Sequence, residues 1–220
     1  MIVLLSMKNE EKIIYIGIAC AYWLATVSSM AGFYFLGEVT QDANDFSTLI
    51  SQRHLLSLGI FLQLINDSCV ILIGLLFYRL WQYTSHGIGL VVLVTRTIEA
   101  TILLIGKLGM LSLALIAKHE SNQCASLLGL VIEDFHFWSF IYGMLPLGVG
   151  GVVLSLFLLK QKGIPQVLAV LGVIGYLLLF AKSIAELFFV ETTPWLFLPV
   201  AIFEFLFPFW LLRRGLRLMK

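Results

Sequence analysis

Six long apolar segments constrain the fold of this chain more than any other feature of its sequence. A run of about 20 apolar residues is long enough to cross the hydrocarbon core of a bilayer as an α-helix. Short polar stretches separate the segments, which lie at 13–36, 55–80, 88–117, 131–159, 166–189 and 195–212. We therefore predict an all-α polytopic membrane protein, with one domain over residues 1–220 that forms a six-transmembrane-helix bundle.

Composition supports the same class of protein. The 220 residues are 60% hydrophobic and 12% charged, with a mean hydropathy of +0.99, whereas a soluble domain is about a quarter charged. The net charge is +1 and no basic run is interleaved with aromatic residues, which excludes nucleic acid as a partner. The predicted partner is the lipid bilayer, and the sequence carries no signal for an oligomeric state or a cofactor. The stretch 1–6 is too short for a signal peptide, so Met1 and Met7 are both candidate start residues.

Lysine and arginine are distributed unevenly between the two ends of the predicted segments. Cytoplasmic loops of membrane proteins carry the excess of these residues. One side has only Arg53 and Lys118, whereas the side that holds both chain ends has Lys8, Lys12, Arg79, Lys160, Lys162, Arg213, Arg214, Arg217 and Lys220. This asymmetry predicts that both termini are cytoplasmic.

Ionisable residues lie inside the apolar segments, where a charge costs at least about 2.5 to 3.5 kcal/mol. Such residues normally face the interior of a bundle and pair with one another. On segment 88–117, Arg96, Glu99 and Lys107 fall within an arc of about 80 degrees, so one helix face carries all three. The candidate ligand-binding residues are Asp67, Arg96, Glu99, Lys107, Lys182, Glu186 and Glu204.

Two interpretations of these charges remain open. The predicted orientation places most of the polar groups in the outer half of the bilayer, which favours a charge-lined cavity that opens outward and binds or transports a small polar or charged solute or an ion. Segment 13–36 has no charge and is expected only to pack against its neighbours. The alternative is a structural or regulatory membrane protein whose charges, which nearly balance, only hold the bundle together.

A metal-dependent intramembrane enzyme is a third interpretation. The sequence contains no His-Glu-x-x-His, Gly-x-Ser-x-Gly or P-loop motif, so an enzyme is not favoured. His136 and Asp134 begin the fourth segment, next to Glu133. Imidazole and carboxylate groups are the ligands that Zn²⁺ takes, which makes His136 and Asp134 the candidate metal ligands.

The fourth segment is rich in glycine and contains a proline. Gly143, Pro146, Gly148, Gly150 and Gly151 all lie within it. Either this segment is a helix that packs closely through its glycines, or it is a broken helix that exposes backbone groups to a cavity. The frequency of glycine and proline in membrane helices favours close packing.

Several short motifs occur in a recognisable order along the chain. They are His54-Leu-Leu-Ser-Leu-Gly59 leading to Asn66-Asp67, Arg96-Thr-Ile-Glu99-Ala100, Lys162-Gly-Ile-Pro165 followed by Leu171-Gly-Val-Ile-Gly-Tyr176, and Glu204 followed by Phe209-Trp-Leu-Leu-Arg-Arg-Gly215. In this order and spacing the chain resembles the bacterial membrane proteins grouped as domain of unknown function 4386, over nearly its whole length.

The resemblance implies a multi-pass protein of the bacterial plasma (inner) membrane with no assigned activity. It also implies that Asp67, Arg96, Glu99 and Glu204 are features of the family. Lys107 and Lys182 have no counterpart in the motifs that carry the resemblance. The family adds no substrate to the interpretations above.

Overall fold

The computed structural model describes residues 2–40, 51–119 and 123–217, with side chains described over 10–37, 51–112 and 130–216. Within these ranges every regular element is helical and there is no strand. Six of the helices are long and apolar enough to cross a membrane, which confirms the predicted all-α architecture. The elements are α1 (Ile2–Thr40), α3 (Arg53–Trp81), α4 (His86–His119), α5 (Gln123–Lys160), α6 (Gln166–Leu187), η1 (Pro194–Phe197) and α7 (Leu198–Arg217).

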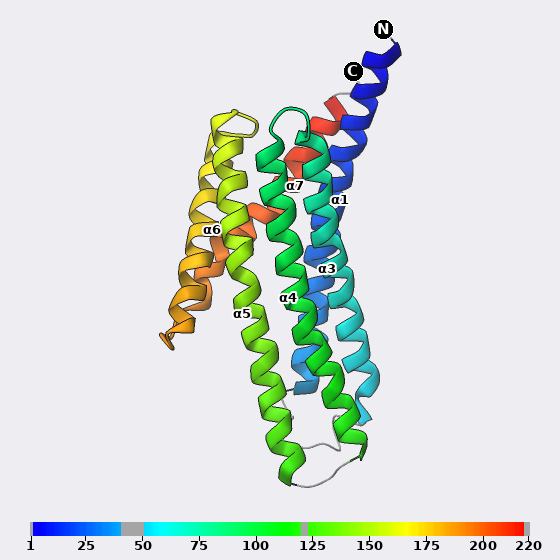
Figure 1. The fold of residues 1–220 in the computed structure, drawn as a ribbon, viewed down its shortest axis with the longest axis vertical. Coiled ribbons are helices and arrows are strands. Elements are labelled where there is room, and N and C mark those ends of the chain that lie inside the picture. The colour runs from blue at the N-terminus through cyan, green and yellow to red at the C-terminus, as the bar shows by residue number, and fades with distance from the viewer. Residues whose placement is uncertain (1, 41–50, 120–122, 218–220) are drawn as a thin grey trace.

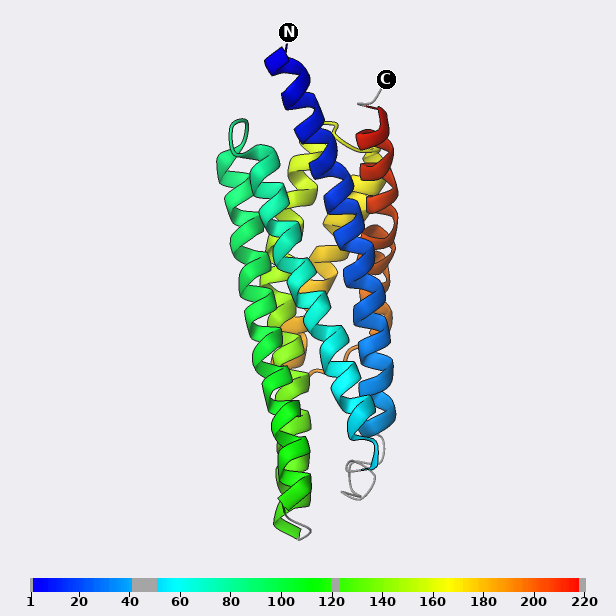
Figure 2. The same ribbon diagram turned by 90° about the vertical axis from the view of Figure 1, so that its right-hand side faces the viewer.

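The six long helices form a closed ring. Each helix contacts the next one along the chain, and α7 contacts α1. The start of α1 and the end of α7 lie at the same end of the bundle, as Figures 1 and 2 show. We call this the terminal end, and its cytoplasmic location stays a prediction from the lysine and arginine distribution.

Helices α6 and α7 form a hairpin and are each shorter than the other four long helices. Figure 1 shows that the hairpin ends well before the far ends of α4 and α5. Helix α6 stops at Leu187 rather than at the predicted residue 189, because Phe189 adopts a positive φ of 56° that breaks the helix. After the turn, Pro194 occupies the first position of η1 and the Thr193 hydroxyl accepts the backbone N–H of Trp195, both typical of a helix start.

Helix α5 runs unbroken through Pro146, so the close-packed alternative for the fourth segment is the correct one. A Cβ atom on Gly148 would lie 2.9 Å from the Cβ of Phe180, and one on Gly143 would lie 3.0 Å from Leu103. The first distance is shorter than real Cβ contacts and the second is tighter than most of them, so glycine lets α4 and α6 approach α5 closely. Helix α5 is therefore a central packing element and not a pair of half-helices.

Two hydrophobic clusters fill the ring at different levels. The larger lies toward the terminal end. In it the ring of Phe207 stacks on that of Phe77, with centroids 6.2 Å apart, and on that of Phe203, with centroids 5.1 Å apart. The smaller joins the far ends of α1, α3 and α4 through Leu36, Leu56, Ile60 and Met110. Tyr22 and Tyr176 of the larger cluster also reach the polar side chains inside the ring.

Candidate functional site

The structure sorts the predicted charges into three separate groups. Each group is joined by hydrogen bonds and ion pairs among the described side chains. The groups are Arg96 with Glu99 and Glu204, Asp67 with Lys107, and Lys182 with Glu186. The sequence predicted that these residues face the interior, and it did not predict how they divide.

The first group, with two tyrosines, forms what we call the central cluster: Tyr22, Arg96, Glu99, Tyr176 and Glu204. Nη1 of Arg96 donates to both carboxylate oxygens of Glu99, at 3.2 and 3.5 Å. Its Nη2 donates to the Tyr22 hydroxyl at 3.2 Å and to Oε1 of Glu204 at 3.1 Å. The Tyr176 hydroxyl donates to the same Oε1 at 2.8 Å. Four helices, α1, α4, α6 and α7, therefore meet at one ionic network.

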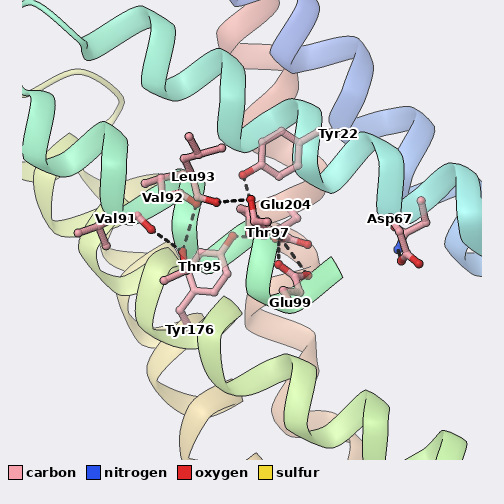
Figure 3. Close-up of polar contacts among 12 residues, drawn as sticks. Tyr22, Asp67, Val91, Val92, Leu93, Thr95, Thr97, Glu99, Tyr176 and Glu204 are labelled. Atoms are coloured by element: carbon pink, nitrogen blue, oxygen red, sulfur yellow. Dashed lines mark hydrogen bonds and ion pairs between the residues drawn. The ribbon is translucent and has the colours of Figure 1, made fainter. Parts of the chain in front are cut away.

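Figure 3 shows Glu204 between the two tyrosines, with Glu99 beside it and Asp67 apart from them.

A glycine allows the close packing around Arg96. Gly74 on α3 brings the backbone of that helix close to Arg96, so that a Cβ there would lie 3.1 Å from the Cβ of Arg96. The local geometry of α4 brings Arg96 to Glu99, because residues three apart on a helix share one face.

A cavity of about 400 Å³ adjoins the central cluster. It is lined by residues of α1, α3, α4, α5 and α7, and its charged lining residues are Arg96, Glu99 and Glu204. Arg96 and Glu99 are almost fully buried, whereas the Glu204 side chain is 26% exposed. Glu204 is therefore the member of the cluster that a molecule in the cavity reaches most directly.

The exposed lining residues of the cavity lie on α1 and α7, and the outward opening expected from the sequence stays a prediction. These lining residues are Met30 and Phe33 of α1, which are 70% and 42% exposed, and Ala201 of α7. The larger hydrophobic cluster supplies part of the cavity wall through Ile73, Leu103, Met144 and Leu147. Figure 1 shows that α7 leans from α1 at the terminal end toward α6 at its other end.

Helix α1 contributes more than the packing that the sequence predicted for it. Tyr22 bonds to Arg96 and also stands beneath its guanidinium, 5.7 Å from the ring centroid. Sequence reasoning missed Tyr22 and Tyr176 because a lone tyrosine in an apolar segment resembles any other core aromatic. Their depth was the available signal, since a buried tyrosine hydroxyl away from the interface needs a polar partner.

The second group is a buried ion pair between α3 and α4. Nζ of Lys107 donates to both carboxylate oxygens of Asp67, at 2.5 and 2.6 Å, and the two side chains are 3% and 7% exposed. Nδ2 of Asn66 donates to the same carboxylate at 3.3 Å. Neither Asp67 nor Lys107 lines the cavity, whereas Asn66 does.

The third group lies at the far end of α6 and fixes the turn into η1. Lys182 bonds to Glu186 one helical turn away and donates to the Thr192 hydroxyl at 2.6 Å. That hydroxyl in turn donates to Glu186 at 2.8 Å, and Lys182 lies 4.9 Å from the centre of the Phe197 ring. Lys182 and Glu186 do not line the cavity either.

The candidate metal ligands are not brought together with further ligands. His136 is half-buried and faces α4 at Gly106, whereas Asp134 is exposed. Among the side chains that the structure describes, no three histidine, cysteine, aspartate or glutamate residues are grouped so that they could hold a metal ion. The metal-dependent enzyme therefore gains no support from these residues.

The fold and the central cluster define a class: a multi-pass helical protein with charged residues buried between its transmembrane helices. The family comparison gives a narrower assignment. The chain belongs to the family described as domain of unknown function DUF4386, whose sequence profile matches residues 18–215. The match includes Asp67, Arg96, Glu99 and Glu204 and confirms the resemblance. Searches of the curated proteins and of the solved structures give no match.

Proposed function

We propose that this protein binds a small polar or charged solute in the cavity beside the central cluster. One observation carries the proposal: a cavity of about 400 Å³ reaches a buried ionic network inside the transmembrane bundle. Ionisable residues in the membrane are costly and normally mark a binding or transport site. A binding site of a few hundred Å³ with a small number of polar groups is typical for a small molecule.

The proposed roles follow from the geometry. Arg96 holds Glu99 and Glu204 in place, and Glu204 contacts the solute because its side chain is the most accessible of the three. Gln63 and Asn66 of α3 also line the cavity and supply amide groups. Hydrogen bonds formed here are strong because the surrounding medium has a low dielectric constant.

We also propose that the protein lies in the plasma membrane with both termini in the cytoplasm. The support is the excess of lysine and arginine at the terminal end. Reporter fusions test this: a fluorescent protein that folds only in the cytoplasm should be active on either terminus. A periplasmic phosphatase fused at either terminus should be inactive, and an active fusion would contradict the orientation.

Binding is tested with purified full-length protein in lipid nanodiscs. A panel of small charged and polar solutes is screened by the shift in unfolding temperature, and hits are measured by isothermal titration calorimetry. We expect at least one saturable ligand, with Arg96→Ala and Glu99→Ala each weakening it by tenfold or more. Unchanged affinity for every hit in both variants would contradict the proposed site.

The second candidate function is structural, and a specific observation favours it: Arg96, Lys107 and Lys182 all have a carboxylate partner. If the charges serve only to hold the helices together, exchanging them should be tolerated. In the double variant Arg96→Glu with Glu204→Arg, the pair that joins α4 to α7 is kept but its direction is reversed. Loss of ligand binding in a folded double variant supports a role of these charges in the solute site. Full retention of ligand binding supports a structural role for them.

A further inference from the structure

The cationic and carboxyl groups that line the cavity do not balance in number. One cationic group, Arg96, lines the cavity together with two carboxyl groups, those of Glu99 and Glu204. The neighbouring Asp67–Lys107 pair is neutral as a unit. A carboxyl group without a cationic partner is neutralised in a low-dielectric interior either by a proton or by a bound cation, so a cation in the cavity would complete the central cluster.

The hydrogen bonds point to the same sign of charge. Both terminal nitrogens of Arg96 already have partners, Glu99 for Nη1 and Tyr22 and Glu204 for Nη2. An anion that binds at either terminal nitrogen would have to displace one of these partners. Oε1 of Glu204 accepts both of that residue's hydrogen bonds, and no described side chain donates to its second oxygen, which leaves an acceptor for a cation.

The walls of the cavity are apolar and aromatic away from the cluster. Phe33 of α1 and Phe140 of α5 meet edge to face, with centroids 5.4 Å apart, beside Met144 and Leu147. Aromatic faces attract cations, most strongly where water is excluded. A ligand with both an apolar body and a positive charge satisfies this lining better than a strongly hydrated ion such as Na⁺.

The exposed part of the cavity lining lies within candidate membrane spans. The exposed lining residues Met30, Phe33 and Ala201 are all inside membrane-spanning stretches. Toward the terminal end α1 and α7 are in contact, where Tyr22 packs edge to face on Phe207 and Gly215 lies close to Tyr15. The exposed lining residues therefore lie beyond this contact, still within the candidate membrane spans.

We propose that the ligand is an amphipathic organic cation that enters from the lipid between α1 and α7, with its charge at Glu204 and its apolar part against Phe33 and Phe140. This inference rests on the proposed function and adds to it the chemical class of the ligand and its route. A protein of this kind differs from a carrier of hydrated ions, whose binding site opens to water.

The sign of the charge is tested without any mutation. Tetraphenylphosphonium and tetraphenylborate have nearly the same shape and opposite charges. Their binding to the wild-type protein in nanodiscs is measured by equilibrium dialysis, with empty nanodiscs subtracted. We expect saturable, stoichiometric binding of tetraphenylphosphonium and at least tenfold weaker binding of tetraphenylborate. Equal affinities, or a preference for the anion, would overturn the inference.

The position of the charge is tested by a matched pair of variants. Glu204→Gln should weaken tetraphenylphosphonium binding by tenfold or more. Glu191→Gln makes the same chemical change at an exposed position in the turn between α6 and η1, and it should leave the affinity unchanged. Equal effects of the two variants would show that the cation does not bind at the central cluster.

The route is tested by a second pair. Ala201 is an exposed lining residue of the cavity, and Ile202 is exposed on the same helix without lining the cavity. We expect Ala201→Trp to slow tetraphenylphosphonium association at least tenfold and Ile202→Trp to leave it unchanged. Equal rates would contradict lateral entry. If no cation binds while a neutral or anionic solute binds with Arg96-dependent affinity, the inference fails and the proposed function stands.

Discussion

The buried pair between Asp67 and Lys107 gives the most demanding test of how the charges contribute to stability. In Lys107→Met the carboxylate loses two hydrogen bonds of 2.5 and 2.6 Å. Among the described side chains, it keeps only the donor from Asn66, at 3.3 Å. Breaking a buried ion pair by removing one partner costs about 3 to 5 kcal/mol, because the other charge remains buried and unpaired. We expect Asp67→Leu to have a similar cost, since it leaves the Lys107 ammonium unpaired.

The double variant should behave differently. Replacing both members of a buried pair by apolar residues of similar size is often neutral or stabilising. The two single costs sum to about 6 to 10 kcal/mol, and we expect the double variant to lie within about 2 kcal/mol of wild type. The coupling free energy between the positions is then at least about 4 kcal/mol.

The assay is reversible unfolding in mixed dodecyl maltoside and dodecyl sulfate micelles, followed by tryptophan fluorescence. The exposed pair of Arg79 and Glu10, at 3.9 Å, is the control, and Arg79→Met should change the free energy of unfolding by less than about 1 kcal/mol. Single variants of the buried pair that cost no more than this control, or a double variant as unstable as the sum of the single ones, would refute the reasoning.

Two further predictions concern the support of the central cluster. Gly151→Ala places a methyl group against the Tyr176 ring, and we expect a loss of about 1 to 3 kcal/mol in the same unfolding assay. Gly37→Ala is its control, because nothing lies within 4 Å of the added atom, and equal losses would contradict the packing argument. Tyr176→Phe removes the 2.8 Å bond to Glu204, which should cost about 1.5 to 3 kcal/mol. An unchanged unfolding free energy would show that this bond contributes nothing.

The number and type of the membrane helices follow from local properties of the sequence. Apolarity over about 20 residues depends only on the segment itself, so all six helices were found. Their ends were less predictable, because α1 and α5 continue beyond the apolar parts at 13–36 and 131–159. The end of α6 was also not predictable, because nothing in the apolar side chain of Phe189 indicates the positive φ that ends this helix.

The pairing of the charges depends on the tertiary structure. The 100-degree periodicity of a helix correctly placed Arg96 and Glu99 together, because both lie on α4. Glu204 joins this pair, whereas Lys107 pairs with Asp67. This division depends on how the helices lean across the ring. The contacts of the two tyrosines with Arg96 and Glu204 likewise depend on how the helices pack, for which no short motif in the chain is a signal.

The contact between the first and last helices has a consequence for biosynthesis. A chain emerges from the ribosome N-terminus first, so Lys107 enters the bilayer after its partner Asp67 is already there. Arg96 enters with Glu99 on the same helix, as a pair that needs no other segment. Glu204 arrives last, and only then can α7 seal against α1 and complete the ring. The nascent protein therefore carries each of these cations beside a carboxylate from the moment of insertion, while its binding site forms in the final step.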